Sequence, residues 1–153
     1  MNENIIKAFN ELAVDILDLF KKVLASDVGI NKKVGKNTLK RSRLARTATI
    51  DADAPFIKLM VNDYIESIEQ GRRERQMPLV PIQDLREWAQ RKGIKSDNHT
   101  LHIIQGAIWR DGIKGRPVMK RFYQLLEKEW NETYANELFN EIVRGFETWF
   151  NKG

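Results

Sequence analysis

The chain has 153 residues and a mass of 17.9 kDa, which suits one domain. Apolar residues make up 42% and charged residues 31%, which is ordinary for a globular protein. Cysteine is absent, which excludes disulfide bonds, a thiol nucleophile and a thiolate metal site. Asp15 and Asp18 interrupt the first apolar stretch, so we expect no signal peptide, and no run is apolar enough to predict a membrane span.

Positive charge is concentrated in one segment. The net charge is +5, from 26 basic and 21 acidic residues. No acidic residue lies between Val28 and Ile50, whereas the other 130 residues carry 19 basic and 21 acidic side chains. The sequence therefore predicts a nearly neutral body with one strongly basic segment. The seven basic residues of this segment are Lys32, Lys33, Lys36, Lys40, Arg41, Arg43 and Arg46.

Residues 3–25 are predicted to form an amphipathic helix, because apolar residues recur there at three- and four-residue steps. Residues 27–50 show no periodicity, and polar and basic residues dominate them. We expect a long, basic, mobile loop at about 28–50, which can include a short strand at Thr47–Ile50. A loop of this length in a compact domain is usually functional or mobile.

The middle of the chain is predicted to combine one strand with short helices. Residues 55–62 are mostly apolar, which favours a strand. Short helices are expected to follow over residues 64–70, 82–92 and 98–111, and a glycine comes directly after each of them.

A long amphipathic helix is predicted after Pro117. Apolar residues recur about every four positions there, which fits one helix of about 30 residues or two helices that break near Asn131. One helix of that length is about 45 Å long, so a domain of this size cannot cover a whole face of it, and we expect Trp149 and Phe150 at an interface. The overall prediction is a single helix-dominated α+β domain over residues 1–153. Long terminal amphipathic helices enclose a small β element and two or three short helices in it.

No group of residues in the sequence predicts catalysis. His99 and His102 are three residues apart, whereas a catalytic zinc site needs a third ligand and usually a four-residue spacing. Glu66 and Glu69 are followed by arginines, so surface ion pairs explain them. Common nucleotide-binding and hydrolase motifs are absent. We therefore expect no enzyme, no cofactor and no metal site.

The basic segment has two candidate partners. Seven cations within 23 residues can neutralise the phosphates of a nucleic acid. They can also contact an acidic protein surface, such as the glutamate-rich stretch Glu127–Glu147 of a neighbouring copy. No aromatic residue lies between residues 21 and 55, so stacking on bases is not supported. Contact with protein is therefore the favoured interpretation.

Three runs between Lys36 and Pro117 occur in a characteristic order. They are GKNTLKRSRLARTATI, FIKLMVNDYIESIEQGRRERQMPLVPIQDLREWAQRKGI and IIQGAIWRDGIKGRP. In this order and spacing they resemble the neck or tail-completion proteins (head–tail joining family) of long-tailed double-stranded DNA phages. The resemblance covers about half of the chain. Its matched positions beyond the first run are Tyr64, Glu69, Gly71, Arg72, Pro78, Pro81, Trp88, Gly93, Gly112, Arg116 and Pro117.

The resemblance implies a structural protein of the virion. Such a protein forms or joins a ring between the portal–adaptor complex and the tail tube, completes assembly and helps to line the DNA channel. The implied partners are further copies of the chain, adjacent connector and tail-tube proteins, and genomic DNA without sequence specificity. The implied location is the head–tail junction of the particle, and during assembly the protein is expected in the host cytoplasm. Residues 28–50 are then expected to contact a neighbouring subunit, the next ring or DNA in the lumen.

The alternative function is a small basic regulator that binds nucleic acid. The basic segment and the short capped helices permit it. However, neither residues 82–92 nor residues 98–111 present a concentrated basic face suited to the major groove. An assembly protein is therefore the preferred hypothesis.

Overall fold

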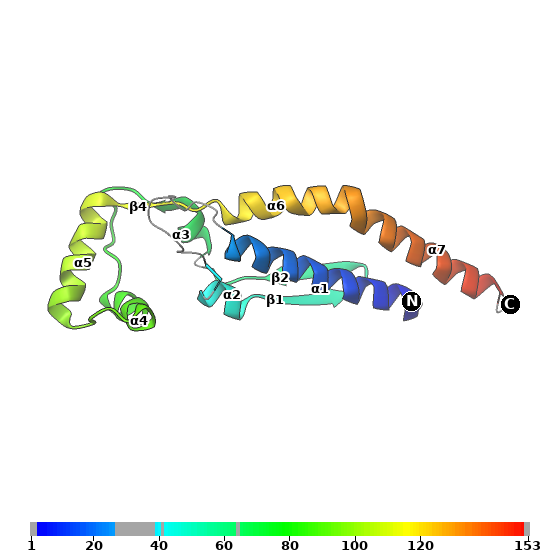
Figure 1. Ribbon diagram of the computed structural model, residues 1–153, viewed down its shortest axis with the longest axis horizontal. Coiled ribbons are helices and arrows are strands. Elements are labelled where there is room, and N and C mark those ends of the chain that lie inside the picture. Colours follow the sequence, from blue (N-terminus) through cyan, green and yellow to red (C-terminus); the bar gives the residue numbers. More distant parts are fainter. Residues whose placement is uncertain (1–2, 27–38, 41, 64, 152–153) are drawn as a thin grey trace. The chain divides into compact units, whose positions relative to one another are not determined.

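The computed structural model describes residues 3–26, 39–40, 42–63 and 65–151, without the side chains of residues 148–150 (Figure 1). Helices dominate it and two small hairpins supply the strands, which confirms the predicted helix-dominated α+β fold. The chain forms two compact units. Unit 1 contains residues 1–65 and 117–153, and unit 2 contains residues 66–116. The single domain expected from the sequence stays a prediction.

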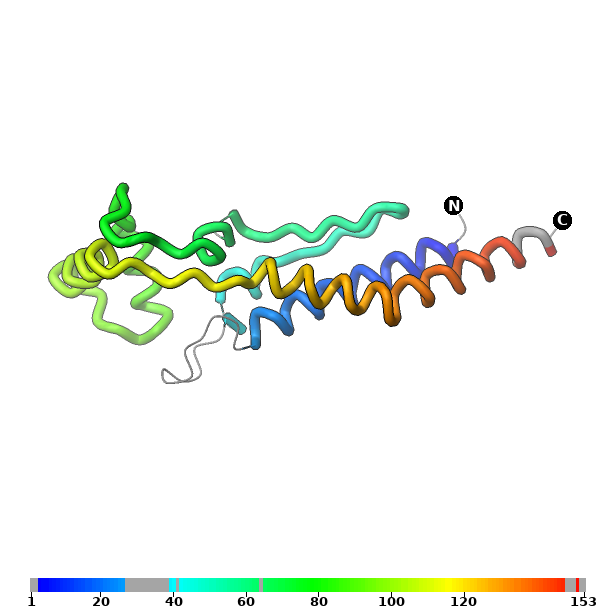
Figure 2. The backbone as a smooth tube through the Cα atoms, turned by 90° about the horizontal axis from the view of Figure 1, so that it is seen from above, coloured from blue at the N-terminus to red at the C-terminus, as the bar shows by residue number. Residues whose placement is uncertain are grey.

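Unit 1 is organised around helix α1 (Glu3–Ala25), which has the predicted bounds. Helix α6 (Val118–Glu129), the π-helical segment η1 (Trp130–Tyr134) and helix α7 (Ala135–Asn151) follow one another directly. They run antiparallel to α1 and pack along it, as Figures 1 and 2 show. The long C-terminal helix is therefore continuous, and a wider turn stands where the sequence allowed a break near Asn131.

The centre of unit 1 is an aromatic contact between α1 and α6. The rings of Phe20 and Phe122 meet edge to face, with centroids 5.3 Å apart and an interplanar angle of 86°. This is a favourable geometry for two aromatic rings. Phe20 is fully buried and Phe122 is 3% exposed, so the contact lies inside unit 1.

A hairpin covers another side of α1. Strands β1 (Thr49–Asp53) and β2 (Phe56–Met60) pair antiparallel, with Ile50 opposite Leu59. Exposed and half-buried side chains alternate along both strands, as expected for a hairpin with one face packed on a helix. β2 falls within the predicted strand, whereas β1 lies mostly beyond the short strand allowed at Thr47–Ile50.

The structure corrects the second half of the loop that was expected at about 28–50. Helix α2 (Arg43–Thr47) lies there, and β1 begins directly after it. The Ser42 side chain accepts a hydrogen bond from the Ala45 amide at 3.3 Å and so caps α2. Leu44 is fully buried and holds the helix to unit 1. One helical turn is too short to produce a visible apolar period, so the sequence pattern missed it.

Unit 2 is a pair of helices closed by a short hairpin. Helix α4 (Ile82–Lys92) and helix α5 (Asn98–Asp111) have the predicted bounds and bury Leu85, Ala89 and Leu101 between them. Gly93 ends α4 in the left-handed conformation, and the Asp97 carboxylate caps α5.

The hairpin of unit 2 pairs β3 (Gly71–Arg72) with β4 (Ile113–Lys114). Helix α3 (Ile65–Gln70) leads into β3. No strand was predicted at either position, because two residues are too few for an alternating pattern.

Two glycines make the hairpin of unit 2 possible. Gly71 has a φ of 69° and Gly112 a φ of 72°. A Cβ at Gly71 would overlap the Ile113 carbonyl, and a Cβ at Gly112 would overlap the Arg72 carbonyl. The Arg116 amide donates to the Ile68 carbonyl at 2.8 Å and ties the end of unit 2 to α3. Four of the positions matched in the sequence, Gly71, Arg72, Gly112 and Arg116, therefore lie where the backbone of the hairpin packs closely.

Substituting Gly112 by alanine is expected to lower the free energy of unfolding by about 1–3 kcal/mol, because the residue is held in a strained conformation against backbone. Gly106 lies inside α5 with no atom within 4 Å of a Cβ. Gly106→Ala should instead raise stability by about 0.4–1 kcal/mol. Urea unfolding of the two variants compares them, and equal stabilities would contradict the role of Gly112.

Candidate functional site

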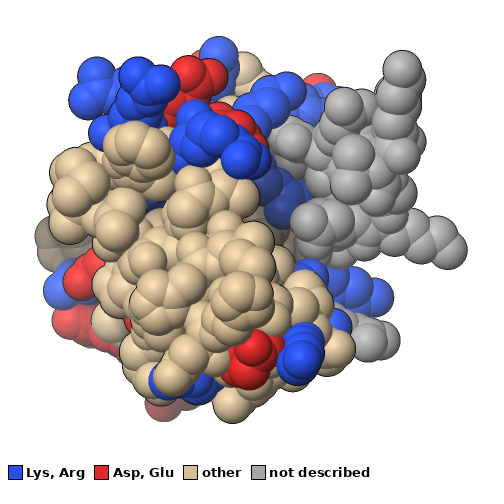
Figure 3. All heavy atoms as spheres, turned by 90° about the vertical axis from the view of Figure 1, so that its left-hand side faces the viewer, with Lys and Arg blue, Asp and Glu red and all other residues tan. Residues whose placement is uncertain are grey.

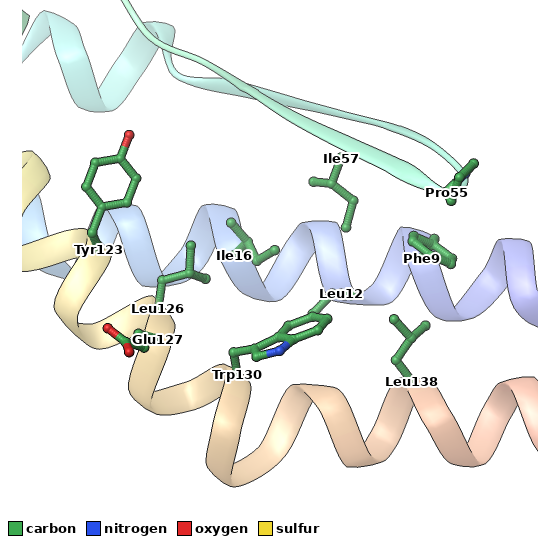
Figure 4. A pocket seen from close by; sticks show the side chains of 10 residues that line it. All are labelled: Phe9, Leu12, Ile16, Pro55, Ile57, Tyr123, Leu126, Glu127, Trp130 and Leu138. Carbon is green, nitrogen blue, oxygen red and sulfur yellow. The ribbon is translucent and has the colours of Figure 1, made fainter.

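An apolar groove crosses unit 1 between the hairpin and the α6–α7 helix, with α1 as its floor (Figure 4). It has a volume of about 420 Å³. Leu12 on the floor is buried, whereas Tyr123 and Trp130 on the wall are 59% and 43% exposed. The lining residues are Phe9, Leu12, Ile16, Pro55, Ile57, Tyr123, Leu126, Glu127, Trp130 and Leu138. Nearly all of this surface is thus suited to apolar side chains.

Helix α7 exposes a second apolar surface. Phe139, Val143 and Phe146 are spaced four and three residues apart, so they share one face of the helix. Phe139 is 64% exposed and Phe146 is 56% exposed. Together with the groove, this stripe leaves unit 1 with more apolar surface than its own fold covers. Exposed apolar surface of this extent is typical of an interaction site.

Carboxylates gather between the N-terminal half of α1 and α7. A small cleft there is lined by four of them together with Tyr134. Burial raises the pKa of Tyr134, and the nearby charges of Asp15, Glu129, Glu137 and Asp18 raise it further. We call this group of carboxylates the acidic patch: Glu11, Asp15, Glu137 and Glu141.

Cations gather at the other end of α1. A hollow there is lined by four of them, with Asp18 at its edge. We call these cations the basic patch: Lys21, Lys22, Lys40 and Arg46. None of the four forms a salt bridge within the described part of the chain. The carboxylates of the acidic patch thus lie along the N-terminal half of α1, with Lys7 paired to Glu11, whereas the cations of the basic patch lie at its C-terminal end, with Asp18 among the lining residues.

The structure describes three of the seven basic residues expected to form an interaction site, namely Lys40, Arg43 and Arg46, and all three are exposed. Lys32, Lys33, Lys36 and Arg41 lie outside the described residues. Lys21 and Lys22 were not predicted to belong to this site, because they precede the segment Val28–Ile50 that has no acidic residue. Their position in the last two turns of the predicted helix, just before the basic segment, was the feature of the sequence that could have indicated them.

Most of the positions matched between Lys36 and Pro117 lie in unit 2, where one of them, Arg72, hydrogen-bonds to backbone carbonyls. The Arg72 guanidinium donates to the carbonyls of Gln76, at 3.1 Å, and Pro78. Burial lowers the pKa of Arg116. The remaining positions described in this unit are Glu69, Gly71, Pro81, Trp88, Gly93 and Gly112.

Pro117 directly precedes α6 in unit 1. Tyr64 lies outside the described residues, as do the side chains of Trp149 and Phe150. Most of the matched positions therefore lie in unit 2, whereas Pro117 and the basic patch lie in unit 1.

Unit 2 also presents exposed apolar side chains. Figure 3 views the molecule from the α4–α5 end, and uncharged side chains occupy most of the face shown. Met77 is 66% exposed and Ile103 is 60% exposed, and the Arg75 guanidinium lies over the Trp109 ring at 5.9 Å. Apolar surface is thus available on both units.

His102 contacts the backbone of its own helix α5. The His102 Nδ1 atom lies 2.7 Å from the Asn98 carbonyl oxygen of its own helix. The Asp97 carboxylate accepts a hydrogen bond from the Thr100 hydroxyl at 2.6 Å, which lowers the pKa of Asp97. Among the described residues, no three metal-binding side chains come together.

Comparisons of the chain with family models, with curated proteins and with solved structures found no match. Within the described ranges, no helix has both the length and the apolar character needed to cross a bilayer. Function is therefore inferred from the surfaces of the two units together with the order of the sequence motifs.

Two neighbouring aromatic residues of α6 should respond differently to truncation. Phe122 is 3% exposed and packs on Phe20, whereas Tyr123 faces the open groove. Phe122→Ala should lower the free energy of unfolding by about 3–5 kcal/mol. Tyr123→Ala should change it by less than about 1 kcal/mol, because its ring is mostly solvated already. Chemical unfolding tests the pair, and a large loss in Tyr123→Ala would show that the groove serves folding rather than binding.

Proposed function

We propose that the chain is a structural protein of a phage head–tail connector, which forms or joins a ring between the portal–adaptor complex and the tail tube. The order of motifs between Lys36 and Pro117 suggests this class. The apolar surface that unit 1 leaves open is the observation that carries the proposal. A protein that functions by assembly needs such surface, and a self-sufficient monomer rarely exposes it.

The size of the uncovered side chains supports assembly. Tyr123, Trp130, Phe139 and Phe146 are all more than 40% exposed on unit 1. Complete burial of a large apolar side chain is worth roughly 1.5–3 kcal/mol. A partner that covers several of them would gain enough to offset the cost of association. Aromatic residues are also the residues that most often dominate binding energy at interfaces.

The seven cations of the basic segment at residues 28–50 suit the interior of a connector. The wall of a channel that carries DNA faces a dense array of phosphates. Cations on that wall attract the DNA backbone without regard to its sequence. A sequence-specific regulator is less well supported, because α4 mixes Arg86 and Arg91 with Asp84 and Glu87. Recognition in the major groove needs a more uniformly basic helix.

The location of the chain tests this function directly. Particles of the phage that encodes the chain should contain it in a copy number typical of a ring. Mass spectrometry of purified particles gives the copy number, and symmetry-resolved electron microscopy should place it at the head–tail junction. Absence of the chain from mature particles would contradict the proposal.

A charge placed in the groove should block incorporation into particles. Tyr123→Glu puts a carboxylate in the apolar groove, and its burial against a partner would be costly. Gln124→Glu adds the same charge at the next residue, which is exposed and outside the groove. Particles assembled with Tyr123→Glu should lose the chain or lose infectivity, whereas Gln124→Glu should be neutral. Equal incorporation of both variants would argue against a role for the groove.

A further inference from the structure

Charge along α1 reverses on a single face of the helix. Glu11, Asp15, Asp18 and Lys22 are spaced four, three and four residues apart, which places them on one side. Lys7 continues this side by one more four-residue step and pairs with Glu11. Glu137 and Glu141 of α7 join the acidic half, and Lys40 and Arg46 join the basic half. The face therefore carries two patches of opposite sign in succession.

The two patches cannot neutralise each other within one copy. Both are fixed to the same helix, and its rigid backbone keeps the N-terminal half apart from the C-terminal half. Asp15 and Glu137 form no salt bridge in the described part of the chain, and neither do Lys22 and Lys40. In the acidic patch, Glu11 pairs with Lys7 at 3.8 Å and Glu141 pairs with Arg144 at 2.7 Å, so the unpaired charge of this patch is that of Asp15 and Glu137. Each patch therefore keeps some charge that a complementary surface could satisfy.

We infer that the acidic patch of one copy docks on the basic patch of a neighbouring copy, so that the occupant of this face is a second copy of the same chain. Charge complementarity carries this inference, because the surface that fits each patch is present on every copy. The inference rests on the proposed ring function and specifies the contact that would build the ring. Because the two patches are different surfaces, their pairing can repeat from copy to copy and close where the rotation permits.

The surroundings of the acidic patch suit a protein partner. Leu12 and Leu138 line both the acidic cleft and the apolar groove, so the two surfaces are continuous. Stable interfaces commonly combine an apolar centre with a charged rim. The described residues that line the hollow at the basic patch also include the carboxylate Asp18 and no aromatic residue, which favours a protein surface over nucleic acid.

The absence of cysteine from the chain allows a direct test by cross-linking. Full-length Asp15→Cys and Lys22→Cys variants are mixed in equal amounts under mild oxidation, and the disulfide-linked dimers are separated by mass. The mixed dimer should exceed both homodimers by at least fivefold, and the excess should fall in 1 M salt because screening weakens the contact. A mixture of Asp84→Cys from unit 2 with Lys22→Cys is the control, and its products should be statistical.

Charge reversal gives a second test that does not depend on disulfide geometry. Asp15→Lys/Glu137→Lys and Lys22→Glu/Lys40→Glu should each associate at least tenfold more weakly than the unchanged chain in sedimentation experiments, because like charges then face each other. Mixing the two variants should restore association. Asp84→Lys/Glu87→Lys changes the net charge as much as the first variant does but lies in unit 2, and it should have no effect.

Statistical cross-linking, or failure of the mixed charge variants to associate, would overturn the inference. If duplex DNA binds the unchanged chain in a salt-sensitive manner and abolishes the mixed dimer, the basic patch is a nucleic-acid surface and the inference also fails. These outcomes are separate from the test in particles. If the chain is found at the head–tail junction but its cross-linking is statistical, the proposed function stands and the inferred contact is wrong. If cross-linking is selective but the chain is absent from particles, the inferred contact stands and the proposed function is wrong.

Discussion

The edge-to-face contact of Phe20 and Phe122 joins α1, which forms the floor of the apolar groove, to α6, which forms part of its wall. It joins two helices that lie far apart in the sequence, and it fixes how α6 lies along α1. The hairpin packs on another side of the same helix. Because α1 serves as a common support, the groove exists only while both of its neighbours stay in place. The buried contact and the open groove are thus two results of one packing arrangement.

The long helices and the fold class could be predicted from the sequence, because apolar residues at three- and four-residue steps leave a clear signal over 23 residues. The short elements could not. Helix α2 depends on a cap at Ser42 and one buried leucine, and the strands of unit 2 depend on two glycines. The basic charge at Lys40 and Arg46 was visible in the sequence, whereas its neighbours Lys21 and Lys22 became evident only when folding placed them beside it.

The groove illustrates the same limit. Its residues come from three separate segments, namely α1, the hairpin and the α6–α7 helix, and most of them taken alone fit an ordinary core position. Apolar periodicity predicts that one face of a helix will be buried. It does not show whether that face packs against the same chain or against a partner. The antiparallel pairing of α1 with α6 and α7 also brings their acidic halves together. The net charge of one stretch can be counted from the sequence. The charge of the segment that packs against it becomes known only from the fold.

The π-helical turn at Trp130–Tyr134 decides which side of α7 meets α1. Phe122 points inward from α6, and an uninterrupted repeat of 3.6 residues would bring Asn136 and Asn140 inward after it. Both asparagines are exposed instead, while Leu138 and Gly145 lie toward α1. The extra residue of the wide turn has rotated everything after it by about 100°. The position of Glu137 and Glu141 beside Glu11 is therefore a matter of helical phase, and one residue in the backbone determines where the negative charge of unit 1 is placed.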